Sequence, residues 1–275
     1  MEDKNIDDIL SEYGEFNREF KENWSNDECK YEYMYHFTSI DSLIKILLTD
    51  SFRLSLVEKM NDINESQPIY KRFGFKVDEN ELKDIKEKEE DIRSRTFLGC
   101  FNILKEEENI RDKVSMWGHY GDSCRGVCLE IDKNKLDRLL FNKIYDNEND
   151  VPKNGLYIAK FNIKYKNQTE INNKKKIFLR LKGEPTHVKR VNVINMFKLK
   201  SEEWKVENEF RYLVYNESRK KMNYFAIKKF TSCINKVFIG DMQDEQSMYL
   251  LKCIKRRLAL PIKFSIREGN EEIEI

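Results

Sequence analysis

The sequence predicts an α+β protein whose mainly antiparallel β-sheet, either continuous or split in two, is flanked by helices. Runs rich in aromatic and β-branched residues, such as YEYMYHF and EFRYLVY, are typical of strands. Other segments carry apolar residues at helical spacing, and no repeat with a period of about 20–50 residues is present. The chain of 275 residues is 12% aromatic, which supplies enough bulky apolar side chains for a hydrophobic core.

Two parts of unequal size are expected: an acidic helical segment over residues 1–30 and a single α+β domain over residues 31–275. The first part holds ten acidic residues against four basic ones. Within it, residues 5–24 predict an amphipathic helix, because apolar side chains recur three to four positions apart. These side chains are Ile6, Leu10, Tyr13, Phe16 and Phe20.

The first strands and helices of the domain follow one another closely. Residues 31–37 alternate as a strand, and Thr38 or Ser39 can cap a helix over residues 41–48. FRLSLV, at residues 52–57, predicts a short strand. Residues 78–94 have a charged, helix-forming composition and predict an exposed helix, or an arm if Leu82 and Ile85 find no partner.

The remaining elements are expected on the same grounds of alternation or helical spacing. Predicted strands cover residues 95–101, 126–132, 156–165, 209–215, 235–240 and 261–268, and predicted helices cover residues 114–122, 133–140, the basic stretch up to Val188, and 244–258. The proline at the start of the last strand predicts an edge position, because proline cannot donate a backbone hydrogen bond.

Four short segments carry side chains suited to chemistry. His36 ends a strand with Thr38 two residues on, a position that suits either a ligand site or a hydrogen-bonded structural histidine. Asn61, Asp62 and Glu65 follow another strand and suit a loop that bonds to itself, or a plain helix cap.

The third segment is MWGHYGD, in which Trp117 and Tyr120 share one face of a helical turn and His119 points elsewhere. One ring would anchor the segment in the core, and the other could form the wall of a pocket. In the fourth segment, WKVENEFR, a strand would place Glu207, Glu209 and Arg211 on one face. The two carboxylates would then form either a functional pair with perturbed pKa values or a surface ion-pair ladder.

A metal site is not expected. His119, Cys124 and Cys128, with His36 as a fourth ligand, could be imagined around an ion, but no CxxC pair is present and structural zinc usually shows tighter spacing. The acidic N-terminus is also unlike a signal peptide, and no run reaches the ~18 apolar residues of a membrane helix. We therefore expect a cytoplasmic protein with reduced cysteines and no membrane contact.

These segments, in this order, resemble a widespread bacterial family called domain of unknown function twenty-nine seventy-one. The MWxHY…GVC block and the WxxExExR block are the most specific parts of the resemblance, which extends over roughly residues 33–265. Families of this kind occur in defence or toxin systems, which is the biological setting that the resemblance implies.

A weaker resemblance points to an activity. His36, Tyr120 and the late ExE pair are similar to the His-Tyr-Glu signature of diphtheria-toxin-like ADP-ribosyltransferases, whose split antiparallel sheet clamps NAD. This resemblance implies that His36 and Thr38 contact the ribose, that Tyr120 stacks on nicotinamide, and that Glu209 stabilises charge as the glycosidic bond breaks. Glu207 or Arg211 would orient Glu209 or the acceptor, and which glutamate is the key acid stays open. Trp117 and His119 are further candidates for nucleotide contact.

Two functions are thus expected from different classes. The first is an NAD-using transferase or glycohydrolase with no metal. The second is a non-catalytic module that binds a nucleotide or a nucleic acid through residues 160–200, which hold twelve basic residues against two acidic ones.

Overall fold

A computed structural model describes residues 31–60, 78–144, 155–172, 193–194, 196–218, 221–259, 261–268 and 271–274. The helix predicted over residues 5–24 lies outside these ranges, as do Asn61, Asp62, Glu65 and most of the basic stretch up to Val188.

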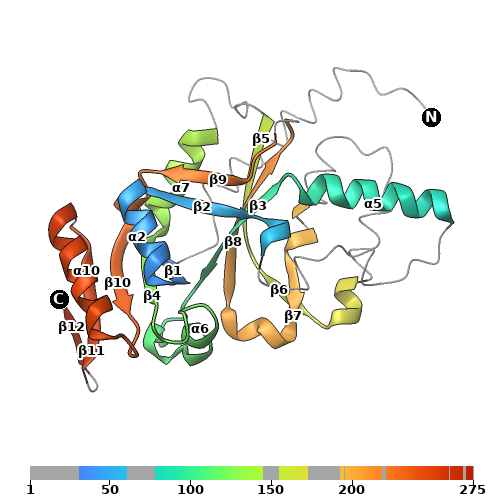
Figure 1. Ribbon diagram of the computed structural model, residues 1–275. Coiled ribbons are helices and arrows are strands. Elements are labelled where there is room, and N and C mark those ends of the chain that lie inside the picture. The colour runs from blue at the N-terminus through green and yellow to red at the C-terminus, as the bar shows by residue number, and fades with distance from the viewer. Residues whose placement is uncertain are drawn as a thin grey trace.

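A ten-stranded, mostly antiparallel sheet forms the centre of the molecule (Figure 1). Neighbouring strands follow the order β12 (Glu271–Glu274), β11 (Lys263–Glu268), β10 (Ile234–Ile239), β4 (Val127–Asp132), β1 (Tyr33–Thr38) and β3 (Thr96–Asn102). At β3 the sheet branches, into β8 (Glu209–Asn216) with β5 (Leu156–Asn162) and into β2 (Ser51–Leu56) with β9 (Tyr224–Lys228). Within this sheet, the described strands β10 and β11 pair in parallel. The predicted α+β class is confirmed.

The branch at β3 splits the sheet. β8 pairs with every residue of β3 along one edge. On the other edge, β1 pairs with β3 at Tyr35 and Asn102, whereas β2 pairs with β3 at Leu98 and Phe97. Between these contacts, no described strand pairs with Gly99–Phe101 on that edge. The split that was one alternative in the prediction is therefore present, between β1 and β2.

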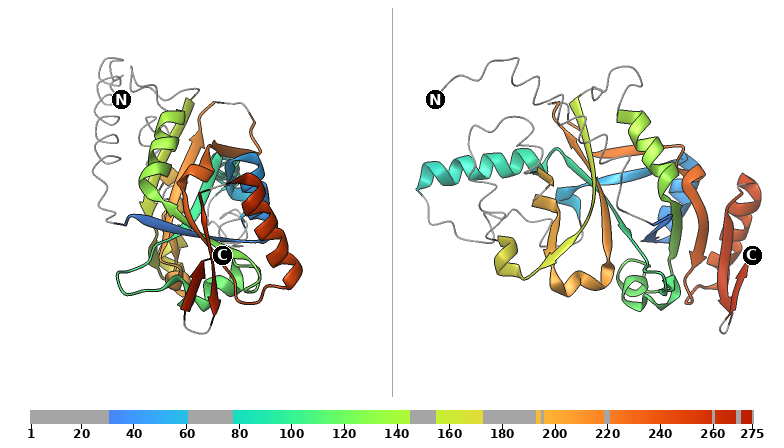
Figure 2. Two further views of the ribbon diagram at one scale, coloured as in Figure 1. Left: turned by 90° about the vertical axis from the view of Figure 1, so that its left-hand side faces the viewer. Right: turned by 180° about the vertical axis from the view of Figure 1, so that it is seen from behind.

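Both faces of the central strands are covered. On β8, Phe210, Tyr212 and Val214 enter one apolar cluster, whereas Leu213 and Tyr215 enter another, as the two-residue period of a strand requires. The first cluster includes residues from α2 (Ile40–Thr49), α7 (Lys133–Ile144) and α10 (Glu245–Leu258). The second includes Ile85 and Ile92 of α5 (Glu79–Arg93), whose far end projects from the body of the molecule (Figures 1 and 2).

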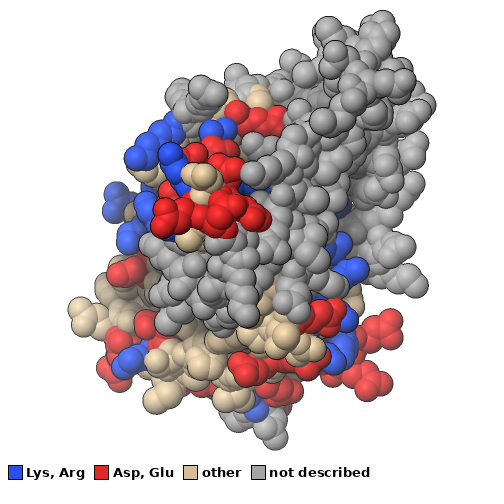
Figure 3. Space-filling model, turned by 90° about the vertical axis from the view of Figure 1, so that its right-hand side faces the viewer, with Lys and Arg blue, Asp and Glu red and all other residues tan. Residues whose placement is uncertain are grey.

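Short elements complete the described chain. They are η1 (Val57–Lys59), η2 (Ile110–Asp112), α6 (Val114–His119), η4 (Glu202–Glu207), η5 (Phe230–Cys233), and the parallel strands β6 (Lys164–Lys166) and β7 (Leu199–Ser201). None of the described helices has the length and apolar character needed to cross a membrane. On the face toward which α5 points, the described acidic and basic residues are interspersed (Figure 3).

Two expectations about elements are wrong. The strand predicted at residues 261–268 is not an edge strand, because β12 pairs with β11 beyond it. β12 has the sequence EEIE, which lacks the apolar alternation that predicts strands; buried Arg111 holds it through two hydrogen bonds to Glu272, of 3.0 and 2.8 Å. In addition, Glu207 belongs to the 3-10 helix η4 and not to a strand, and Asn208 turns the chain into β8 with a φ of 44°.

Candidate functional site

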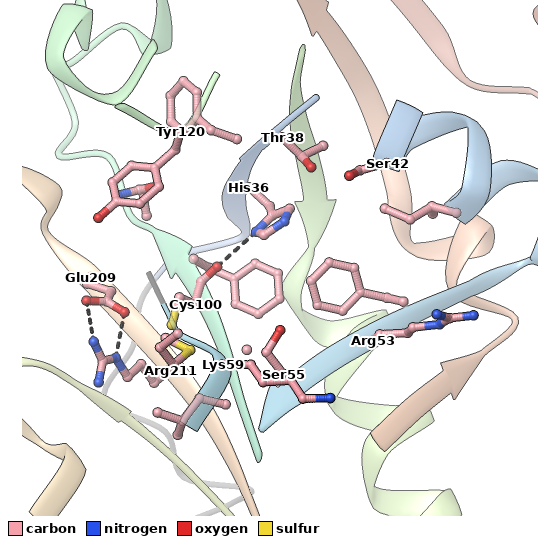
Figure 4. A pocket seen from close by; sticks show the side chains of 18 of the residues that line it. His36, Thr38, Ser42, Arg53, Ser55, Lys59, Cys100, Tyr120, Glu209 and Arg211 are labelled. Carbon is pink, nitrogen blue, oxygen red and sulfur yellow. Dashed lines mark hydrogen bonds and ion pairs between the residues drawn. The ribbon is translucent and has the colours of Figure 1, made fainter. Parts of the chain in front are cut away.

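A pocket of about 420 Å³ opens at the split in the sheet (Figure 4). This volume lies within the range of roughly 300–1,000 Å³ that is usual for small-molecule sites. Six of the residues predicted from the sequence line it: His36, Thr38, Tyr120, Glu207, Glu209 and Arg211. The pocket therefore joins the front of the chain to its last third.

The split explains how these side chains reach a common space. Tyr35 pairs with Asn102, and Asn102 pairs with Glu209, so these three residues share one face of the sheet. His36 therefore belongs to the opposite face, where its ring contacts Phe52 and Phe101. In a continuous sheet His36 and Glu209 would be separated by the backbone. Here the unpaired edge of β3 lets one pocket extend to both.

His36 is held as a neutral acceptor. Its Nδ1 lies 3.0 Å from the backbone oxygen of Cys100 (Figure 4). A carbonyl oxygen only accepts hydrogen bonds, so Nδ1 carries the proton and Nε2 keeps its lone pair. Burial lowers the pKa of His36, which favours the same neutral form. Ser39 caps α2 by accepting from the Ser42 backbone N–H at 3.2 Å, so Thr38 is not needed for capping.

The aromatic segment divides as the helical spacing suggests. Trp117 is buried, donates from Nε1 to the Ile110 backbone oxygen at 2.9 Å, and packs edge-on against Phe37. Tyr120 lines the pocket and donates its hydroxyl proton to Glu207 Oε1 at 2.8 Å. His119 is exposed beside the Trp204 ring and does not line the pocket.

The two carboxylates have different partners. Glu209 accepts from Arg211 through both oxygens, at 2.5 and 2.8 Å (Figure 4). Glu207 accepts from Tyr120 and, at 2.6 Å, from Lys200 Nζ, which also lies 3.2 Å from Glu209. The glutamates are 4% and 5% exposed, and Arg211 is fully buried. A surface ion-pair ladder, one of the two alternatives from the sequence, is therefore wrong for these residues.

Burial and charge set the two pKa values apart. Burial opposes ionisation of Glu209, but the charges of Arg211 and Lys200 outweigh it and hold the pKa of Glu209 at about 2. For Glu207, burial raises the pKa; the Glu209 charge adds to that rise and Lys200 opposes it. Burial, together with the nearby Glu207 charge, also raises the pKa of Tyr120. Glu209 is thus firmly ionised, and Glu207 is the carboxylate with the more easily gained proton.

The other arm of the pocket is basic and was not predicted. It is lined by Lys45, Arg53 and Lys59, together with the hydroxyls of Ser42, Thr49, Ser51 and Ser55. On β2, Arg53 and Ser55 are exposed between buried Phe52, Leu54 and Leu56. That alternation in FRLSLV was a visible signal for a polar strand face, but nothing in the sequence showed which cavity the face lines.

Lys200 and Asn102 were also missed. Lys200 comes at the end of a basic stretch, and its burial between two acids depends on the turn at Asn208. Asn102 donates from Nδ2 to the Glu207 backbone oxygen at 2.5 Å, which ties the end of η4 to β3. Among the described residues, no group of three His, Cys, Asp or Glu side chains is placed to hold a metal ion.

Comparison with known proteins finds a match to one family over part of the chain. Residues 116–212 match the family described as Protein of unknown function (DUF2971). The match begins at Met116 and ends just after Arg211, so it contains both of the specific blocks and confirms the resemblance over that stretch. His36 and Thr38 lie outside it.

One solved structure matches the chain at low similarity. It is "Thermus sp. 2.9 DarT in complex with NAD+", with 12% sequence identity and a TM-score of 0.36 over 86% of this chain and 96% of that chain. No curated protein matches the sequence.

Proposed function

We propose that the pocket binds NAD and that the protein is an ADP-ribosyltransferase-like enzyme, which transfers ADP-ribose to an acceptor or to water. The observation that carries the proposal is the division of one pocket into two chemically different ends. One end holds the paired carboxylates with Tyr120 nearby, and the other holds three basic side chains among hydroxyls.

The carboxylate end suits glycosidic cleavage. When the bond between the ribose C1′ and the nicotinamide nitrogen breaks, the electron pair leaves with nicotinamide and positive charge develops on the ribose. A preorganised carboxylate stabilises that charge in a desolvated site. An acceptor nucleophile or water then bonds to C1′ and releases a proton. Glu209 and Glu207 are the candidates for the stabilising role.

Each of the other predicted residues has a role that its geometry permits. His36 Nε2 can accept a hydrogen bond from a ribose hydroxyl because Nδ1 already donates to Cys100. Thr38 lines the pocket close to His36 and can add a second polar contact. Tyr120 has its hydroxyl engaged with Glu207, which fixes its ring as a wall on which nicotinamide can stack. Arg211 orients Glu209.

The basic end suits the diphosphate. Of the residues that the structure describes, five basic and two acidic side chains line the pocket: Lys45, Arg53, Lys59, Lys200 and Arg211 against Glu207 and Glu209. Lys200 and Arg211 pair with the two acids, which leaves the positive charge of the lining concentrated at the other end. Anionic phosphates would be favoured there, and arginine in particular binds phosphate through two parallel hydrogen bonds.

The test is incubation of the purified full-length protein with NAD that is labelled on its adenylate half. We expect nicotinamide release and, in the presence of cell lysate, label on an acceptor. Arg53→Gln should raise the KM for NAD by at least ~10-fold, as expected for loss of a charge-assisted bond. Arg125→Gln, an exposed site outside the pocket, is the matched control. Absence of both nicotinamide release and acceptor labelling would contradict the proposal.

The alternative is a nucleotide-binding module without turnover, which the net positive lining of the pocket favours on its own. In that case NAD or ADP-ribose should raise the melting temperature while nicotinamide stays bound in its nucleotide. The same Arg53→Gln variant should then lose the thermal shift, whereas Arg125→Gln should keep it.

A further inference from the structure

Lys200 reaches the acid pair because of a tight chain reversal. β7 ends at Ser201, η4 follows directly, and Asn208 turns the chain into β8. Residues 200, 207 and 209 are thereby brought together, with Lys200 Nζ 2.6 Å from Glu207 and 3.2 Å from Glu209. The ammonium group of Lys200 lies over the Trp204 ring, with Nζ 5.0 Å from the ring centre.

The two cations, Lys200 and Arg211, pair differently with the two glutamates. Arg211 donates to both oxygens of Glu209, so the negative charge of Glu209 is compensated whether or not Lys200 is present. Lys200 is the cation that contacts Glu207, and no other described Lys or Arg does so. Removing Lys200 would therefore leave Glu207 with Tyr120 as its polar partner beside an already ionised Glu209.

We propose that Lys200 is a positioning residue that keeps Glu207 ionised and directed into the pocket, and that Glu207 is the carboxylate whose charge governs the site. The role in the reaction rests on the proposed function; the ionic pairing of Lys200 with Glu207 does not. The proposal assigns Glu209 the structural task of holding Arg211.

Among the described titratable groups around the two glutamates, Lys200 and Tyr120 favour ionised Glu207, and Glu209 opposes it. Those groups are Tyr120 at the end of α6, Lys200 on β7, Glu209 and Arg211 on β8, Tyr165 on β6 and Cys100 on β3. Burial and Glu209 both raise the pKa of Glu207, and Lys200 opposes them. Loss of Lys200 must therefore raise that pKa further.

The direction of the stability effect follows. A glutamate whose pKa is raised by folding stabilises the fold when it is protonated, below its unfolded value of 4.5, and that stability is lost as pH rises through the folded pKa. Lys200→Met should therefore lower the melting temperature most at neutral pH and regain it as the solution is acidified. Glu207→Gln added to Lys200→Met should remove this recovery.

The experiment compares four variants of the full chain: Lys200→Met, Lys200→Arg, the double variant Lys200→Met/Glu207→Gln, and Lys205→Met as control. Lys205 lies on η4, the 3-10 helix that carries Glu207, but it is exposed. Melting temperatures are measured from about pH 8 to pH 5, and kcat/KM for NAD is measured over the same interval. We expect the acidic limb of the rate profile to move up by about one pH unit or more in Lys200→Met. Lys200→Arg should restore it, and Lys205→Met should match the wild type.

The two readouts separate two kinds of failure. NAD turnover in Lys200→Met with an unshifted acidic limb and an unchanged melting profile would overturn the role of Lys200 and leave the proposed function intact. Acid-dependent recovery of Lys200→Met that Glu207→Gln abolishes supports the pairing even if no variant consumes NAD. In that second case the proposed function fails and the ionic assignment stands.

Discussion

At the scale of single residues, the pocket depends on charges that are buried and mutually compensated. Glu209 and Arg211 form a bidentate pair with almost no solvent exposure. Such a pair contributes little net stability while it is intact, but loss of one member leaves the other uncompensated in a desolvated site. A single substitution at Glu209 therefore has two separable effects, one on the reaction and one on the fold.

We predict that Glu209→Gln lowers NAD turnover by at least ~10²-fold, because it frees Arg211 and disturbs the charges that surround Glu207. The same variant should lose about 3–5 kcal/mol of unfolding free energy, because Arg211 stays buried without its counter-ion. Urea denaturation and nicotinamide release measure the two effects.

The double variant Glu209→Gln/Arg211→Met is the control for this prediction. It removes both members of the pair, so it should recover part of the lost stability while remaining inactive. If Glu209→Gln proves as stable as the wild type, the pair does not hold Arg211 in the way described here.

At the scale of elements, the connection between α6 and β4 fixes the end of β1 that carries Thr38. Asp122, Ser123 and Cys124 all have left-handed backbone conformations, with φ values of 51°, 55° and 66°. Each such residue costs about 1–2 kcal/mol, so the surrounding contacts must hold them. Gly126 is central to those contacts: it donates to the Gly121 backbone oxygen at 2.7 Å and accepts from the Gly240 N–H at 2.9 Å.

Gly126→Ala should therefore lower the unfolding free energy by about 1–3 kcal/mol or more, as overpacking does. A β-carbon at residue 126 would lie 2.3 Å from the Thr38 backbone oxygen and 2.8 Å from that of Gly121. Gly118→Ala is the matched control, because a β-carbon there meets nothing within 4 Å and alanine favours the helix by up to about 1 kcal/mol. Equal urea midpoints for the two variants would refute this account of the loop.

At the scale of the whole molecule, β8 is the strand around which the described fold is built. All eight of its residues are buried, and it pairs with β3 on one side and β5 on the other. β12 is its opposite: it pairs with β11, and its residues are mostly exposed. Local opening should be rare in the first strand and frequent in the second.

Hydrogen exchange followed by mass spectrometry checks this order. Amides of Glu209–Asn216 should exchange slowest among the described strands, and those of Glu271–Glu274 should exchange fastest, because β12 can detach without disturbing the core. Protection of β12 equal to that of β8 would show that the buried Arg111 couples the terminal strand to global unfolding.

The tertiary structure of the whole molecule also determines which basic residues of positions 160–200 are exposed. Residues 160–200 suggested a surface for nucleic acid, yet two of the basic residues at its ends are buried in ion pairs. Lys160 lies 2.8 Å from Asp137, and Lys200 lies between the two glutamates. The basic residues between positions 173 and 192 lie outside the described residues, and Lys164 is exposed, so the nucleic-acid surface remains a prediction.

The sequence by itself determined the α+β class, the strands such as β1, β3 and β8, the helices α2 and α10, and the family match across the two specific blocks. These features are local, because alternation, helical spacing, capping and short motifs each depend on residues that are close together in the sequence. The same local reading also selected six pocket residues, although it could not assign their partners.

The tertiary structure alone decided that the sheet splits at β3 and that one pocket extends to residues of both faces. It also decided that Lys200 lies between Glu207 and Glu209, and that Arg53 lines the opposite arm. The physical reason is that these arrangements depend on strand order, on one left-handed turn at Asn208 and on burial, which join residues as far apart as His36 and Glu209. No short-range pattern encodes such distances.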